Sequence, residues 1–501
     1  MSVSPLRLFP VHCLAAAVIF LGGGLGLSAF AGPWISPGDT ALRSDILMLA
    51  DAGFITAPVS TWPLAWGDIA ASLDGSIDEL RPHELAAWAR LRRRADAEMI
   101  IGQGVLNGSA SFAEHPRQIR TFEDGPREEE IEIGVGYDWT GDRFAASLQG
   151  QWVSDPLDGD EWRADGSYVG VALGNWMFAV GATDRWWGPG WQSSGILSSN
   201  ARPVPAFTLE RNSTKAFKTK WLSWIGDWDL AVMYGFLESD RTIPDAHLFG
   251  MRFNIKPLKW LELGVSRLAM YCGDNRPCGL DTFIDLLLGK DNRGDNVSAE
   301  DEPGNQLAGY DIRLSGSGLG WPVAAYFERT GEDEQDFKPS LFLNEIGLET
   351  WGQWNGLGEY RVFLEMADTL CGGNLTGSGT PDCAYNHKIY ETGVRYKGRT
   401  IAHSLDNDAK VFTLGGVLTD ERDNSWLLTL AYGDLNRVRD PDPRNPVATV
   451  ETQYREVEVS HRRSTRFGDF NVGLGYEMRK NVITKNSDDN FRAYLEWSND
   501  F

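Results

Sequence analysis

Segments in which apolar and polar residues alternate recur along the chain from about residue 100 to the C-terminus. In one of them, apolar or small residues occupy every second position from Phe144 to Trp152, with polar residues between them. The same pattern runs over 228–236, 360–366, 426–432 and 470–476. Each run is about 9 to 11 residues long, which a tilted strand needs to cross a bilayer, whereas strands of soluble sandwiches have about 5 to 6. The alternation predicts an all-β transmembrane antiparallel barrel over residues 99–501, in an outer membrane.

The connections between these segments fall into two classes. Tight turns are expected at 140–142, 174–175 and 256–257, and long polar loops near 114–129, 155–166, 184–213, 272–305, 370–386 and 437–452. Short turns on one side and long loops on the other are typical of outer-membrane barrels, whose strand number is even. A direct count gives about 19 strands, so we predict about 18, with about 20 possible. The mismatch falls at 385–411, where the chain holds a hidden strand or an inward-folded segment.

The N-terminal part differs from the rest. Residues 1–31 are predicted to be a signal peptide, because Arg7 and His12 precede the apolar run 13–27 and Ala29-Phe30-Ala31 matches a cleavage site. A retained membrane anchor is the alternative, but glycines at 22–24 interrupt its apolar run. Residues 32–98 are predicted to form a small α-helical bundle or plug on the periplasmic side. Its helices are expected from a cap at Ser36 to Gly53, over 66–73 and over 82–97.

Four cysteines follow the predicted signal peptide, as the local pairs Cys272 with Cys278 and Cys371 with Cys383. An even number of cysteines in an exported chain predicts disulfides, and the Gly- and Asn-rich segments between them are typical of loops outside the bilayer. Metal binding is the alternative, but neither segment contains a histidine or the spacing of a zinc site. The acidic stretches 155–161 and 291–295 lack the ligand positions of a calcium loop. We predict no metal and no cofactor.

The densest cluster of unusual residues begins at Asp184 and contains three tryptophans around a Gly-Pro-Gly turn. Because proline lacks an N–H donor and glycine weakens a strand, this cluster must lie at a strand end or fold inward. Flat indole faces beside Asp, Arg and Asn side chains suit a sugar, whereas an aromatic girdle at the membrane interface is the alternative interpretation. The glycan-binding candidates are Asp184, Arg185, Trp186, Trp187, Trp191, Asn200 and Arg202.

The formal net charge of −23 argues against a nucleic-acid partner and would repel an acidic glycan. A glycan would then be neutral, be bridged by divalent cations, or meet a local basic patch. The residues considered for that patch are Arg185, Arg202, Arg211, Lys215, Lys218 and Lys220. We predict no enzymatic activity, because the sequence has no nucleophile elbow and no paired-histidine metal helix. His403-Ser404, near Asp406 and Asp408, is explained equally well by polar lumen residues.

The run DRWWGPGWQSSGILSSNARPVP, the later run GRTIAHSLDNDAK and the small helical N-terminal part together resemble the Wzi family of capsule-assembly proteins. The resemblance covers essentially the whole mature chain. It implies an outer-membrane barrel of about 18 strands with a periplasmic helical bundle. It also implies a non-enzymatic lectin that holds capsular or related polysaccharide at the cell surface. Trp186, Trp187, Trp191, Arg185 and Arg202 would be glycan contacts or scaffold of the site. A porin or a polysaccharide export channel is the alternative function.

The C-terminal strand predicts two further partners. Its apolar residues alternate from Phe491 to the terminal Phe501, and this ending resembles the signal that the outer-membrane insertion machinery reads. The outward face of such a strand contacts outer-membrane lipids. Phe501 would lie on the periplasmic side, which directs the tryptophan cluster and both cysteine pairs toward the outside.

Overall fold

The computed structural model describes residues 34–123, 129–287, 304–318, 321–335, 338–372, 379–438 and 441–501. The predicted signal peptide therefore lies outside the described residues, as does the acidic stretch 291–295. Among the described residues, no helix is long and apolar enough to span a membrane.

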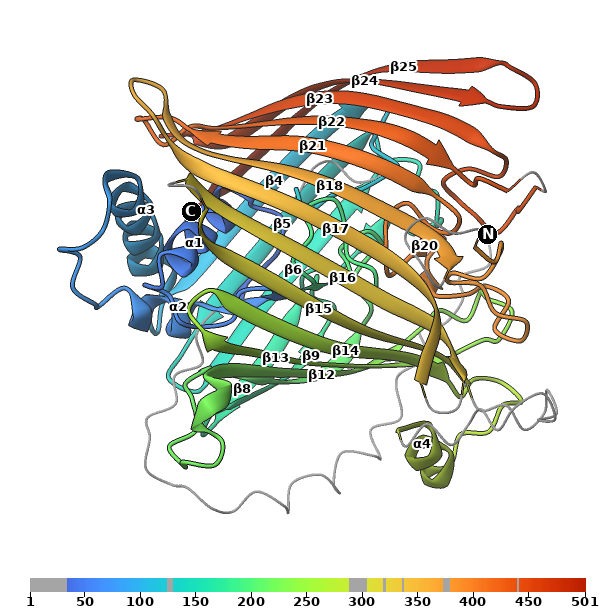
Figure 1. Ribbon diagram of the computed structural model, residues 1–501, viewed down its shortest axis with the longest axis horizontal. Coiled ribbons are helices and arrows are strands. Elements are labelled where there is room, and N and C mark those ends of the chain that lie inside the picture. Colours follow the sequence, from blue (N-terminus) through green and yellow to red (C-terminus); the bar gives the residue numbers. More distant parts are fainter. Residues whose placement is uncertain are drawn as a thin grey trace.

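Eighteen strands form a closed antiparallel barrel, as predicted (Figure 1). Neighbours in sequence are neighbours in the wall, and pairing of the last strand with the first closes it. In chain order the wall strands are β4 (Gly104–Glu114), β5 (Ile131–Thr140), β6 (Phe144–Val153), β8 (Tyr168–Leu173), β9 (Trp176–Gly181), β11 (Ala206–Arg211), β12 (Asp227–Phe236), β13 (His247–Leu258), β14 (Leu261–Tyr271), β15 (Gly304–Gly318), β16 (Trp321–Gln335), β17 (Lys338–Trp354), β18 (Gly358–Gly372), β21 (Lys410–Thr419), β22 (Ser425–Leu435), β23 (Thr452–Thr465), β24 (Gly468–Asn481) and β25 (Ser487–Asp500). The two-residue β7 (Trp162–Arg163) pairs only with the end of β6.

The strands are less uniform than the sequence suggested. β8, β9 and β11 have 6 residues each, whereas β17 has 17. β11 lies within 184–213, so the prediction of a loop is wrong for the C-terminal part of that segment. Lys256-Pro257, predicted as a turn, belongs to β13 at a shift of register, and the turn follows at 259–260. A bulge accommodates a proline inside a strand, because the local ladder is already interrupted.

The segment before β21 settles the strand number. Residues 379–409 carry only the small hairpin of β19 (Arg395–Tyr396) and β20 (Arg399–Thr400) and no wall strand. Ala402, Ser404, Leu405 and Asp406 in this segment are fully buried. The inward-folded alternative is thus the correct one, and it removes the odd strand from the direct count.

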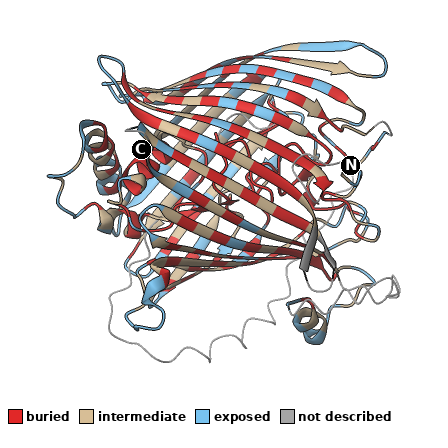
Figure 2. Cartoon of the chain, viewed as in Figure 1, coloured by how far each residue is buried: buried red, intermediate tan, exposed pale blue. Residues whose placement is uncertain are grey.

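The outer surface of the wall is apolar, as the alternation requires. In β22, Leu428, Leu430 and Tyr432 are exposed while Thr429 between them is buried. Figure 2 shows this alternation of exposed and buried residues along the strands. At the end with the short turns, Trp260, Trp321 and Trp354 are exposed. Such a ring of aromatic side chains marks the interface between lipid and water in outer-membrane barrels.

Three helices cover this short-turn end, which is the periplasmic one: α1 (Thr40–Asp51), α2 (Trp66–Ser72) and α3 (Pro82–Glu98) (Figure 1). The predicted helical part is confirmed, but α1 is capped by Asp39 rather than by Ser36. The Asp39 carboxylate accepts a hydrogen bond from the Leu42 N–H at 2.9 Å. Gly38, at φ 130°, directs the chain away from a helical path just before this cap. A fourth helix, α4 (Leu280–Leu287), lies in the long loop after β14 at the opposite end.

Candidate functional site

The lumen of the barrel is filled by chain that enters from both ends. We call this material the plug; it consists of residues 55–65, 116–123, 182–205 and 379–409. Two short strands join its halves: β2 (Thr61–Trp62) follows α1, β10 (Trp186–Trp187) belongs to the long loop after β9, and the two pair antiparallel. Figure 2 shows predominantly buried segments inside the barrel. The predicted tryptophan cluster therefore folds inward.

The three tryptophans of the cluster lie in the core of the plug. Trp186 and Trp187 are each 1% exposed, and Trp191 is 2% exposed. Trp191 stacks on Phe363 of the wall with ring centroids 5.0 Å apart. The Arg43 guanidinium of α1 lies 4.3 Å from the centre of the Trp191 ring, so the periplasmic helix is in contact with the cluster. The tryptophans are thus not part of the aromatic girdle, and their burial favours a scaffold role over direct glycan contact.

The Gly-Pro-Gly turn explains how the plug approaches the wall so closely. A Cβ on Gly188 would overlap the Glu328 carboxylate, and one on Gly190 would overlap the Glu345 carboxylate. A larger residue would force the glutamate side chain to move, and at Gly190 it would also overlap the Ser193 carbonyl. The motif therefore permits close contact between a loop and a wall strand.

The wall glutamates supply hydrogen bonds that the irregular plug backbone cannot make with itself. The Trp191 and Gln192 N–H groups donate to the two Glu365 carboxylate oxygens at 2.5 and 2.7 Å. One oxygen of Glu262 accepts from the N–H groups of residues 59 and 60 at 3.0 and 2.9 Å. Buried N–H groups need partners, and a charged acceptor makes a stronger bond than a neutral one. The inward glutamates therefore hold the plug backbone in place.

Buried ion pairs fix the periplasmic half of the plug. Asp51, at the end of α1, pairs with Arg313 at 2.5 Å and with Arg361 at 3.1 Å, and both arginines also pair with Glu349. Burial alone would raise the pKa of Asp51, but the two arginines lower it below its usual value. Much acidic charge is therefore paired inside the barrel, so the net charge of −23 does not describe the outer mouth.

Asn200 and Arg202 lie toward the outer end of the plug, where Asn200 is buried and Arg202 is half-buried. The Asn200 amide donates to the Thr400 carbonyl at 2.9 Å. Arg202 pairs with Asp158, Asp160 and Asp165 at 2.7, 2.9 and 2.9 Å. Both residues line a small cavity near the outer rim, which we call the mouth pocket. Its lining residues are Arg120, Glu129, Asp158, Arg163, Asn200, Arg202, Lys397 and Arg399.

The mouth pocket is a network of paired charges rather than a basic patch. Burial alone would raise the pKa of Asp158, but the hydrogen bond from Arg202 lowers it below its usual value. Lys397 also contacts this loop, through Asp160 at 2.6 Å. The acidic stretch 155–161, considered above for calcium, thus has arginine and lysine partners. The pocket itself holds about 10 Å³ of free space, room for about one water molecule.

The other glycan-binding candidates and the residues considered for a basic patch do not lie together. Asp184 is half-buried, and Arg185 is buried with its guanidinium donating to the Thr183 carbonyl at 2.9 Å. Burial lowers the pKa of Arg185. The basic patch considered from the sequence does not exist as one surface. Its members Arg211, Lys215, Lys218 and Lys220 lie at the periplasmic end, across the membrane from Arg202.

Sequence reasoning missed Arg120, Arg163, Lys397 and Arg399 as residues of the mouth pocket. A signal was available for Arg399, which lies in the run GRTIAHSLDNDAK. The histidine and acids of that run are structural: His403, Asp406 and Asp408 are at most 1% exposed. Asp406 pairs with Arg395, and burial lowers the pKa of His403 to about 3.

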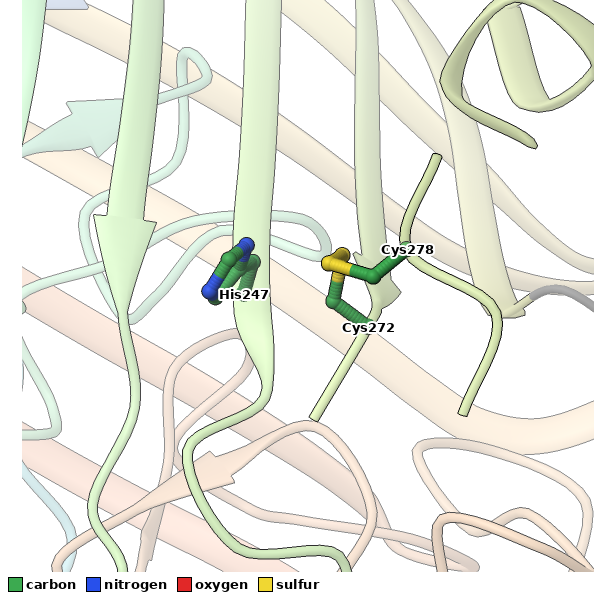
Figure 3. A group of neighbouring side chains, drawn as sticks. All are labelled: His247, Cys272 and Cys278. Atoms are coloured by element: carbon green, nitrogen blue, oxygen red, sulfur yellow. A yellow bond between two sulfur atoms is a disulfide. The ribbon is translucent and has the colours of Figure 1, made fainter. Parts of the chain in front are cut away.

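Both predicted disulfides are present, between Cys272 and Cys278 and between Cys371 and Cys383. Figure 3 shows His247 beside the first of them. Its ring nitrogen and the two sulfur atoms lie within 4.8 Å of one another, an arrangement that would suit a metal if the sulfurs were free. They are bonded to each other, and His247 Nδ1 shares a hydrogen bond with the Tyr234 hydroxyl at 2.7 Å. Disulfides, rather than a metal site, are therefore the correct interpretation of these cysteines.

Residues 109–493 match the family model described as capsule assembly protein Wzi. The chain belongs to the Wzi family. A Klebsiella pneumoniae relative, described as an uncharacterized 55.8 kDa protein in the cps region, is 29% identical over 424 residues, which cover 84% of this chain and 81% of the relative. The solved structure of Escherichia coli Wzi is similar with a TM-score of 0.80 and 26% identity, over 94% of this chain and 100% of that one. It is described as an outer-membrane, carbohydrate-binding β-barrel involved in group 1 capsule assembly. Wzi membership confirms the predicted family and, with the barrel, the outer-membrane location.

Proposed function

We propose that this protein is a lectin-like outer-membrane protein that attaches or organises capsular or extracellular polysaccharide at the cell surface, without catalysing a reaction. Family membership supports the role in capsule assembly. The observation that carries the proposal is the plug, which fills the lumen with buried side chains and ends in a polar, charged pocket at the outer rim. A filled barrel suits a binding protein better than a conduit.

The chemistry of the mouth pocket suits sugar hydroxyls. Each hydroxyl both donates and accepts, so guanidinium groups beside carboxylates match it on both counts. The lining is rich in arginine and lysine, and Asp160 and Asp165 offset part of that charge by pairing with Arg202, so the pocket does not repel an acidic glycan. Because the pocket has room for about one water molecule, the glycan would lie across its entrance. Arg202 and Lys397 are the proposed contacts, and the buried Asn200, Trp186, Trp187 and Trp191 are the scaffold beneath them.

Binding of purified protein to the host's own exopolysaccharide, measured by pull-down, tests this proposal. Arg202→Gln with Lys397→Gln should weaken binding by about tenfold, since it removes two charged hydrogen-bond donors. The matched control is Arg92→Gln, in an exposed ion pair on α3 at the opposite end of the molecule. Equal binding by the double variant and the control would remove the mouth pocket from the proposal. No binding by the wild type would contradict the lectin function itself.

Planar-bilayer conductance separates this function from that of a porin or export channel. The filled lumen predicts no wide, steady conductance for the wild type. A steady open level that competes with added polysaccharide would favour the export channel instead.

A further inference from the structure

The connection between β11 and β12, residues 212–226, is longer than the tight turns at the periplasmic end. We call it the lysine–tryptophan loop. Lys215, Lys218 and Lys220 are exposed in it, and Trp221 and Trp224 are 88% and 68% exposed. Trp260, Trp321 and Trp354, which are also exposed at this end, lie in a tight turn or at the end of a wall strand. Two tryptophans and three lysines within ten residues therefore form a distinct surface.

The loop is held in a defined conformation on the helical end of the barrel. The Thr214 backbone N–H and hydroxyl donate to the Asp68 carboxylate of α2 at 3.3 and 2.5 Å. The Ala216 N–H donates to Asp227 at 2.9 Å. Phe217 stacks on Trp228 with ring centroids 4.6 Å apart. These contacts fix the base of the loop, so the exposure of its tryptophans is a property of the fold.

The exposed tryptophans continue the lipid-facing band of the barrel. A 3-10 turn, η2 (Ser223–Ile225), ends the loop and contacts β13. The end of β13 and the turn that follows it present Leu258 and Trp260, which are also exposed. Trp221 and Trp224 thus extend the aromatic girdle at the level where headgroups meet water, a position that tryptophan favours because its ring is apolar and its N–H polar.

The lysines give this part of the girdle a charge. Among the described residues, Lys215, Lys218 and Lys220 form no ion pair, and Asp227 next to the loop accepts hydrogen bonds from Thr56 and Ala216. Lys259 is exposed in the neighbouring turn. Lysine side chains at a membrane interface extend to lipid phosphates while their alkyl stems stay on apolar surface. A cluster of lysines on a chain of net charge −23 is complementary to an anionic surface.

We propose that the lysine–tryptophan loop binds anionic phospholipid headgroups of the periplasmic leaflet. The tryptophan rings lie at the headgroup level, and the three ammonium groups contact the phosphates. This surface is distinct from the mouth pocket, which lies at the opposite end of the barrel. It therefore does not depend on the proposed glycan function.

Native mass spectrometry of the purified full chain in neutral detergent tests the proposal, with phosphatidylglycerol and phosphatidylcholine as probes. The wild type should retain phosphatidylglycerol in preference. Lys215→Gln, Lys218→Gln, Lys220→Gln should reduce that preference by about tenfold, since each lysine near a membrane surface contributes to anionic lipid binding. The matched triple Lys→Arg variant keeps the charge and should keep the preference. Trp221→Ala with Trp224→Ala should reduce retention of both lipids.

Trp162→Ala with Lys485→Gln is the positional control, because both residues are exposed on the long-loop side. This variant should retain both lipids as the wild type does, and its barrel should keep the heat-dependent gel mobility of the wild type. Equal retention of the two lipids by the wild type would overturn the proposal. Unchanged retention in the triple Lys→Gln variant would overturn it as well, and would favour an acidic periplasmic protein as the partner of this loop.

Discussion

The wall and the plug of this barrel satisfy the same backbone chemistry by different means. A wall strand such as β22 pairs along its whole length with the strands on both sides. The plug contains only two-residue strands, so its N–H groups depend on glutamates such as Glu365. The helix α1 beneath it depends on ion pairs such as Asp51 with Arg313. Irregular backbone at membrane depth is tolerated only where protein groups replace water. We therefore expect single side-chain substitutions to destabilise the plug and the helices beneath it more than the wall. Three variants test this expectation.

The largest effect is expected from Asp51→Ala. It leaves Arg313 and Arg361 with one carboxylate, Glu349, in a buried site, which costs about 3 to 5 kcal/mol. Hydrogen exchange of the α1 amides in increasing denaturant should show the loss, while exchange of the wall amides stays unchanged. Asp74→Ala breaks an exposed pair with Arg92 and should leave stability almost unchanged, because solvent screens such a pair. An equal loss in both variants would show that the buried network does not dock the helix.

A smaller effect is expected from Gly190→Ala. The new Cβ would overlap the Glu345 carboxylate and the Ser193 carbonyl, and overpacking of this kind costs about 1 to 3 kcal/mol. Exchange at residues 186–200 should increase. Gly67→Ala in α2 is the control, because nothing lies within 4 Å of its Cβ, and it should be neutral or slightly stabilising. If residues 186–200 exchange at the wild-type rate in Gly190→Ala, the turn accommodates the new methyl group without a loss of stability.

The smallest effect is a pH dependence of the outer half of the plug. Burial lowers the pKa of His403 to about 3, so the folded plug holds a neutral imidazole. The unfolded segment binds the extra proton below about pH 6.5, so stability falls as the pH falls from there toward 3. One pH unit below 6.5, the cost is about 1.4 kcal/mol. Exchange at 401–408, corrected for intrinsic rates, should rise on acidification in the wild type but not in His403→Gln. The same acid response in both would exclude His403 as its source.

The wall was largely predictable because each strand carries its own pattern. β6 and β12 end within one residue of the predicted boundaries. β11 was missed because it has 6 residues and lies between two loops that carry the polar and proline residues. The disulfides were predictable because each pair is local in sequence.

The plug was predictable only in outline. Proline and glycine excluded a spanning strand at 186–191, but nothing local identifies Thr61–Trp62 as the partner of Trp186–Trp187. The mouth pocket was not predictable for the same reason, because the partners of Arg202 are aspartates from a separate loop, the one that precedes β8. The candidate tryptophans were therefore identified as important residues, while their burial depended on contacts that no single segment encodes.

The pairing of β2 with β10 gives the two faces of the membrane a direct mechanical connection. A segment anchored to the periplasmic helices and a segment that begins beside the mouth pocket share one antiparallel ladder. A displacement of the outer segment by one residue would reverse which side chains face the wall glutamates, and the inner segment would have to follow. We expect strain applied at the cell surface to reach the periplasmic helices through this ladder as well as through the wall, to which Glu262 and Glu365 attach the plug.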